Sequence, residues 1–290
     1  LIDKAIIPSV LAEIDAEEIT EKARVPVYRI NAIAPREESL KDINVLGFDI
    51  ETYHPEGEGI NAKKNPIIMA ALYGKELRRV YCWKRFPTDN PDYVFVNSES
   101  ELIQGICDTI AAENPDMIAG YFSDGFDFPY LKARAEKYKI KLDFSPDYSE
   151  MSVSTKRNDS AKITGISHLD VFKFVSKVLG ATLKTESYSL NAVSEELLGE
   201  KKVDVELSDL SRVWDNEGPE LERFAAYNLQ DAQLTYQLAH KVLPTVLELV
   251  RMVGLAVFDV NRMGFSQAVE AYLLRMAHQF NEVAPKQADQ

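Results

Sequence analysis

Apolar residues form short runs in some parts of the chain and recur at helical spacing in others, a pattern typical of an α/β fold. Three apolar runs, at 45–52, 66–73 and 78–83, have the length of strands, and their short connections predict antiparallel neighbours. A fourth strand is predicted at 116–121. A helix precedes it, as in a βαβ-like unit, so this strand is expected to lie parallel to the first.

Helices are predicted where apolar residues recur every three to four positions. Ser98 and Glu101 have the spacing of a capping box, and the helix that they begin is expected to end at Asn114-Pro115. Further helices are predicted from Asp127, at 190–198, at 219–253 with a bend or break at Pro244, and at 266–283.

Three other segments lack a helical period. Residues 1–44 contain several prolines and many charges and are expected to be irregular. Residues 151–166 are mostly polar with some alternation and predict a protruding hairpin, and 258–260 predict a short extended piece. The apolar stripe of the last helix, which includes Tyr272, Met276 and Phe280, is expected to be exposed unless another domain or a second copy covers it.

The composition is that of a globular protein. The 290 residues are 46% hydrophobic and 27% charged, which excludes a mainly disordered or collagen-like chain. The net charge is −13, from 46 acidic and 33 basic residues, and by itself argues against a nucleic-acid-binding surface. It fits an acidic surface or an acidic site that holds cations.

The cysteines and the apolar runs bear on the cellular compartment. Cys82 and Cys107 both lie in apolar surroundings, so they are expected to be buried free thiols in a reducing cytoplasm. No apolar run approaches the roughly 18 residues of a membrane span, and no leader peptide is visible. The chain begins at Leu1 instead of Met, which suggests a fragment.

Two acidic residues lie in the second half of the first predicted strand. Asp49 and Glu51 are two positions apart, so both side chains point to the same face of a sheet. Two adjacent carboxylates at the end of an apolar strand are costly unless a cation neutralises them, and such oxygen ligands favour Mg²⁺ or Mn²⁺. Taken alone, such a pair is more often an ordinary surface feature.

Two more acidic residues have unusual positions. Asp127 follows the second buried strand at the beginning of a helix, where it could also serve as an N-cap. Asp231 lies in the long helix, with Tyr227 one turn earlier on the same face, and could also face solvent.

Together these residues form a pattern that resembles the proofreading 3′–5′ exonuclease domain of family B DNA polymerases, especially the archaeal ones. The resemblance rests on three motifs in this order: Phe48-Asp49-Ile50-Glu51-Thr52, the segment 121–131 (YFSDGFDFPYL), and Tyr227-Asn228-Leu229-Gln230-Asp231. It covers nearly the whole chain and is poorest over 9–44.

The resemblance implies a ribonuclease H-like α/β fold, a mixed sheet flanked by helices. It divides the chain into a remnant of an N-terminal domain at 1–44, the exonuclease domain at 45–250, and a linker and helix at 251–290 that lead to an absent palm domain. The implied partners are a single-stranded DNA 3′ end or primer-template, the other polymerase domains and, through the full-length protein, a sliding clamp. The implied location is the cytoplasm, in association with the nucleoid.

The resemblance also implies the chemistry, which is hydrolysis of DNA with two Mg²⁺ or Mn²⁺ ions and release of 5′-dNMPs. The implied metal residues are Asp49, Glu51, Asp127 and Asp231, with Tyr227 orienting the nucleophile. Candidate DNA-binding residues are Thr52, Phe122, Phe126, Lys156 and Arg157.

One residue departs from the family pattern at the site. Phe122 stands where the family usually has Asn, so weakened or shifted activity is expected. A catalytically silent DNA- or partner-binding module therefore remains an alternative, as does a different ribonuclease H-like enzyme such as an RNA 3′-exonuclease. The His168-Leu169-Asp170 segment is expected to have a structural role, not a catalytic one.

Overall fold

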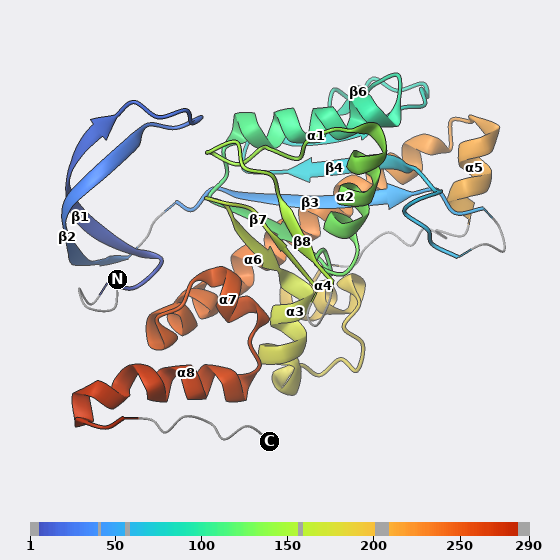
Figure 1. Cartoon of the computed structure of the whole chain (residues 1–290). Coiled ribbons are helices and arrows are strands. Elements are labelled where there is room, and N and C mark those ends of the chain that lie inside the picture. The colour runs from blue at the N-terminus through green and yellow to red at the C-terminus, as the bar shows by residue number, and fades with distance from the viewer. Residues whose placement is uncertain (1–5, 40–41, 56–58, 156–158, 201–208, 284–290) are drawn as a thin grey trace.

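The computed structural model describes residues 6–39, 42–55, 59–155, 159–200 and 209–283. Its centre is a six-stranded mixed sheet with the strand order β10-β7-β3-β4-β5-β6 (Figure 1). These strands are β3 (Val45–Thr52), β4 (Ile67–Tyr73), β5 (Arg78–Cys82), β6 (Tyr93–Phe95), β7 (Met117–Gly120) and β10 (Ser167–Asp170).

The pairing of the strands agrees with the sequence analysis. Strands β3, β4 and β5 are antiparallel neighbours, and β7 lies parallel to β3. Strand β10 extends the parallel part of the sheet beyond β7, and β6 runs parallel to β5. The carboxyl ends of β3, β7 and β10 therefore lie at the same edge of the sheet.

Helices cover both faces of this sheet (Figure 1). The helices of the fold are α1 (Glu99–Glu113), α2 (Asp127–Tyr138), α3 (Val171–Phe174), α4 (Leu190–Leu198), α5 (Leu210–Asn216), α6 (Leu221–Val253), α7 (Val257–Arg262) and α8 (Phe265–Ala277). A π-helical turn (Val175–Leu179) and a 3₁₀ turn (Gly180–Thr182) follow α3, and a second 3₁₀ turn (His278–Phe280) follows α8.

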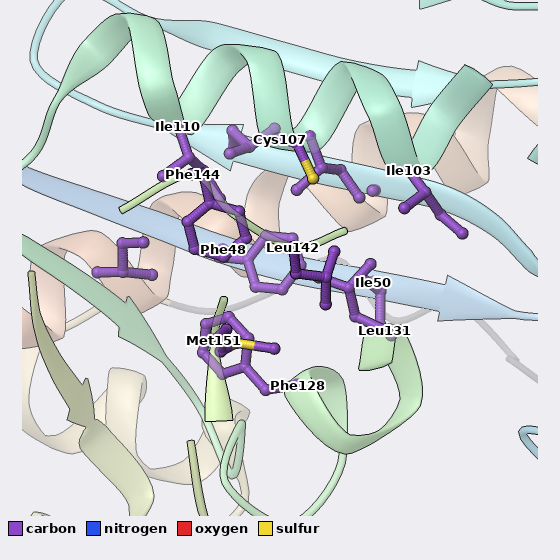
Figure 2. Close-up of a cluster of buried hydrophobic side chains, with 14 of the residues drawn as sticks. Phe48, Ile50, Ile103, Cys107, Ile110, Phe128, Leu131, Leu142, Phe144 and Met151 are labelled. Carbon is purple, nitrogen blue, oxygen red and sulfur yellow. The ribbon is translucent and has the colours of Figure 1, made fainter. Parts of the chain in front are cut away.

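The alternation along β3 divides the core between the two faces. Phe48 and Ile50 pack with α1 and α2, where the Phe48 and Phe128 rings stack with centroids 5.4 Å apart (Figure 2). Val45 faces the opposite side, in a cluster with Leu238 and Val242 of α6. Asp49 and Glu51 have the parity of Val45, so β3 directs both carboxylates toward α6.

Helix α1 shows how the sequence sets an element boundary. The Ser98 side chain accepts a hydrogen bond from the Glu101 amide at 3.2 Å, as the capping-box spacing predicts. The return bond differs, because the Glu101 carboxylate accepts from the amide of Asn97 instead of Ser98. The left-handed Asn114 ends the helix, as predicted.

Both cysteines are buried free thiols, as expected. Burial raises the pKa of each to about 12. Among the described residues, no helix is both long and apolar enough to cross a membrane.

The prediction that residues 1–44 are irregular is wrong for the part that the structure describes. Strands β1 (Val10–Ile19) and β2 (Val27–Ser39) form a two-stranded antiparallel sheet beside the central one (Figure 1). Both strands are largely exposed, so their apolar and charged residues do not alternate clearly. Pro35 lies in β2 beside a register shift in the pairing, where a missing N–H is tolerated.

The extended piece predicted at 258–260 is also wrong, because this segment lies in α7. Val257 and Val260 are three positions apart and bury the same side of one helical turn against α6 and β10. Helix α6 continues through Pro244 without a break.

The remaining predictions differ in outcome. The hairpin is present as β8 (Ser152–Ser154) and β9 (Ser160–Lys162). Helix α8 begins at Phe265 and buries none of its described side chains. Tyr272 and Phe280 are exposed as expected, while Met276 is half-buried.

Candidate metal centre

Three carboxylates from two distant parts of the chain meet at the carboxyl end of β3. One oxygen each of Asp49, Glu51 and Asp231 lies within 4.8 Å of the others. Asp49 and Glu51 come from β3, and Asp231 comes from α6. Within the described residues this is the group of acidic side chains that fits a metal ion.

Gly47 explains why α6 can approach β3 so closely. A Cβ atom at this position would lie 2.4 Å from the carbonyl oxygen of Ala232 and 3.0 Å from the Cβ of Tyr236. No side chain fits in this space, so the glycine lets the helix backbone rest on the strand. Asp231 immediately precedes Ala232, so this contact brings it to Asp49 and Glu51.

Asn228 is a site residue that the sequence analysis did not single out. It is fully buried on α6, and its Nδ2 donates to Oδ2 of Asp49 at 2.7 Å. The bond fixes the orientation of the Asp49 carboxylate beside Glu51 and Asp231. The only sequence signal was its place inside the third motif.

Asp127 lies beside this group but is bonded differently. It is the first residue of α2, and its Oδ1 accepts the amide of Ile50, between Asp49 and Glu51, at 3.2 Å. Strand β7 pairs with β3 only over 45–47, so the Ile50 amide lies beyond the end of that ladder. Burial raises the pKa of Asp127 to about 7, and the charges of Asp170 and Asp231 also raise it.

Phe122 has a strained backbone. Its φ of +63° lies in the left-handed region, which Asn adopts more readily than Phe. Its ring is 46% exposed, covers Gly125 and meets Phe172 edge-on at 5.3 Å. The turn therefore presents an exposed aromatic ring at a position whose backbone conformation favours Asn or Gly.

The other candidate DNA-binding residues differ in accessibility. Phe126 is half-buried and packs against Tyr130 with ring centroids 5.4 Å apart. Thr52 is buried, and its hydroxyl bonds to Nε2 of His54 at 2.7 Å. Lys156 and Arg157 lie outside the described residues. Tyr227 is half-buried on α6, one turn before Asp231.

The comparisons with known proteins agree with this architecture. The family model for the exonuclease domain of DNA polymerase family B matches residues 1–193. A DNA polymerase of Pyrococcus horikoshii is 37% identical over 255 residues, which are 87% of this chain and 20% of the relative. A DNA polymerase of Thermococcus gorgonarius is 33% identical over 251 residues, which are 86% of this chain and 31% of the relative.

A solved structure shows the same fold. The family B DNA polymerase of Pyrobaculum calidifontis superposes with a TM-score of 0.81 at 26% sequence identity, covering 100% of this chain and 36% of that one. The chain thus spans a fifth to about a third of the length of these polymerases. By its family model, its relatives and its fold, the chain belongs to the exonuclease-domain family of family B DNA polymerases.

Proposed function

We propose that this chain removes nucleotides from the 3′ end of DNA by hydrolysis and releases 5′-dNMPs, as the proofreading exonuclease of a DNA polymerase. The observation that carries the proposal is the convergence of Asp49, Glu51 and Asp231 in a member of this family. Three carboxylates this close together repel one another unless cations bind between them. The DNA substrate is also an anion, so cations would let it approach this site.

The donor set fits divalent ions of the Mg²⁺ or Mn²⁺ type. All three side chains offer hard oxygen ligands, and their oxygens lie close enough together to share one ion. We propose two ions, held by Asp49, Glu51 and Asp231, with Asp127 contributing through water. When bound, such ions lower the pKa of an attacking water and stabilise the negative charge on the leaving oxygen.

The neighbouring side chains have distinct tasks in this proposal. Asn228 holds Asp49 in one orientation through the 2.7 Å hydrogen bond. Tyr227 lies one helical turn before Asp231, so its hydroxyl can reach the same face and orient the attacking water. Asp127 fixes the end of β3 through the Ile50 amide.

DNA binding in this proposal relies on stacking near the carboxylates. Aromatic rings bind bases of any sequence, which suits an enzyme that shortens arbitrary strands. The exposed Phe122 is the best placed of the candidates, and Phe126 presents a half-buried ring on the same turn. Lys156 and Arg157 are proposed as further DNA-binding residues on the ground of their positive charge, whereas the buried Thr52 offers little contact surface.

The domain boundaries form a further part of the proposal. We propose an N-terminal remnant at 1–44, the exonuclease domain at 45–250 and a connecting segment at 251–290. The six-stranded sheet begins at Val45, and β1 and β2 form a separate sheet, which supports the first boundary. The exposed residues of α8 support a contact with polymerase domains of a longer protein.

The cellular role rests on the relatives. We propose that the longer protein is a DNA polymerase that acts in the cytoplasm at the nucleoid, on primer-template DNA and with a sliding clamp. Its Pyrococcus relatives are DNA polymerases, which supports the polymerase part of this proposal.

The test uses single-stranded DNA labelled at its 5′ end. Purified chain with Mg²⁺ or Mn²⁺ is expected to give a ladder that shortens from the 3′ end. The double variant Asp49→Ala, Glu51→Ala and a reaction with EDTA are expected to give none.

Three results would contradict the proposal. A ladder that persists in the double variant would assign the activity to another site or a contaminant. No ladder from this chain, and none from the full-length polymerase that contains it, would favour the catalytically silent module. Shortening of RNA but not of DNA would favour an RNA exonuclease.

A further inference from the structure

A second set of buried charged groups lies under the turn that leads to Asp127. We name it the Asp124 cluster; it consists of Asp124, His168, Asp170, Lys173, Asn261 and Arg262. Asp124, His168, Asp170 and Asn261 are all 0% exposed. The six residues come from the 121–126 turn, β10, α3 and α7. None of the roles proposed above uses them.

The Asp124 carboxylate joins three elements. Its Oδ1 accepts the amide of Ala161 in β9 at 2.7 Å and Nη2 of Arg262 in α7 at 2.8 Å. Its Oδ2 accepts Nζ of Lys173 in α3 at 2.8 Å. Burial alone would raise the pKa of Asp124, but His168 and Arg262 together hold it well below its ordinary range. The side chain is therefore a charged junction inside the protein.

Asp170 fixes the turn itself. Its Oδ1 accepts the amide of Phe122 at 3.1 Å, and its Oδ2 accepts the amide of Asp124 at 3.0 Å. Asn261 of α7 bonds both the amide and the carbonyl of Asp170, at 3.0 and 2.9 Å. Helix α7 is thus connected through β10 to the turn that presents Phe122 and continues into Asp127.

The same cluster holds the β8–β9 hairpin. Within the described residues, these two strands pair as a sheet of their own, separate from the central sheet. The amide of Ala161 is bonded to Asp124, and its carbonyl lies 2.9 Å from Nδ1 of His168. Lys173 also donates to the carbonyl of Asp159. The second hairpin strand is therefore bonded to the same junction as the turn.

We propose that Asp124 and Arg262 are positioning residues that hold the hairpin and Phe122 in register with the metal-site carboxylates. They set how well a DNA end is bound and aligned, and they take no part in the hydrolysis. The inference rests on the proposed exonuclease function. Because Arg262 lies in α7, its bond to Asp124 also connects α7, which follows the long helix α6, to the turn that carries Phe122.

The test compares Arg262→Gln, Arg262→Lys and Asp124→Asn with the wild-type chain. Hydrogen–deuterium exchange and steady-state kinetics on a mismatched primer-template are measured for each. The control is Arg134→Gln, which breaks another buried ion pair, with Glu99, outside the cluster. Assays are run at temperatures equally far below each variant's unfolding midpoint, so that loss of global stability is matched.

For Arg262→Gln and Asp124→Asn we expect faster exchange at 121–126 and 159–162, with helix α1 unchanged. We expect KM to rise roughly 3- to 30-fold, the range of coupling carried by such networks, with kcat little changed. Arg262→Lys keeps a cationic donor and should recover part of the loss. Arg134→Gln should leave KM and the exchange of both segments as in the wild type.

Three outcomes would overturn the inference. One is unchanged exchange in both segments, and another is a fall in kcat at constant KM. The third is an equal rise in KM for Arg134→Gln, which would indicate a general effect of destabilisation. If neither the wild-type chain nor the full-length polymerase that contains it hydrolyses DNA, the proposed function fails, while the exchange data and DNA binding measured by fluorescence anisotropy in EDTA still test the positioning role.

Discussion

Asn228 donates a 2.7 Å hydrogen bond from its side-chain amide to the Asp49 carboxylate, across the interface between α6 and β3. It lies on the same helix as Asp231, three residues earlier. One helix therefore supplies both a carboxylate of the proposed metal centre and the group that orients a second carboxylate.

Replacing Asn228 by Ala is expected to weaken metal binding and activity. Residues that orient metal ligands typically contribute about 10- to 100-fold in affinity or activity. Exonuclease rates measured across a Mg²⁺ titration should show a higher half-saturating concentration. Thr235→Ala is the matched control, because Thr235 is also fully buried on α6. Equal Mg²⁺ requirements in both variants and the wild type would show that Asn228 does not orient Asp49.

Gly47→Ala is expected to separate α6 from β3. The added Cβ would lie 2.4 Å from the Ala232 carbonyl oxygen, so the helix backbone must move. Overpacking of this kind costs roughly 1–3 kcal/mol of stability. The same movement shifts Asp231 away from Asp49 and Glu51, so activity should fall as well. Urea unfolding and the exonuclease assay measure the two effects.

Gly59→Ala is the control for Gly47→Ala. A Cβ at Gly59 meets no atom within 4 Å, so stability should change by less than about 0.5 kcal/mol. Similar unfolding midpoints for the two alanine variants would contradict the close packing of α6 on β3.

Asp127 predicts a pH dependence of stability in the metal-free protein. The pKa of Asp127 in the folded protein, about 7, lies above the ordinary aspartate value of 3.8. Between pH 3.8 and 7 the folded state holds a proton on Asp127 that the unfolded state has lost. The stabilisation of the folded state by this proton is therefore complete at low pH and is lost as the pH rises toward 7. In EDTA, the free energy of unfolding should therefore fall more steeply over this range in the wild type than in Asp127→Asn. Parallel pH profiles would refute the raised pKa.

The buried ion pair between Arg134 and Glu99 predicts a large effect on stability. Nη2 of Arg134 and Oε2 of Glu99 lie 2.5 Å apart, and the two side chains are 1% and 3% exposed. Arg134→Ala leaves the Glu99 charge buried without this cation, which typically costs about 3–5 kcal/mol. Arg29→Ala breaks the exposed pair with Glu17 and should cost about 0–1 kcal/mol. Denaturant titrations of both variants test the difference, and equal losses would contradict it.

The central strands and most helices could be predicted because each depends on a local pattern. The apolar run at 45–52, the Ser98 cap and the left-handed Asn114 act within a few residues of the element that they define. Strands β1 and β2 could not be predicted in this way. Ile14 and Ile30 are about half exposed, so burial does not require apolar and polar residues to alternate along these strands. In α7, one short turn gains its stability from contacts with β10 and α6 that no local pattern reveals.

The sequence by itself determined the antiparallel pairing of β3, β4 and β5, the parallel direction of β7, the parity that puts Asp49 and Glu51 on one face, and the three motifs that indicate the family; strands β6 and β10 were not predicted. These depend on backbone geometry and on residue type at fixed spacing. Only the tertiary structure decided that Asp231 joins the other two carboxylates, that Asn228 bonds Asp49, and that Arg262 bonds Asp124. The last two pairs are 179 and 138 residues apart in the chain. Such contacts depend on how helices dock on the sheet, and no periodicity along the chain encodes them.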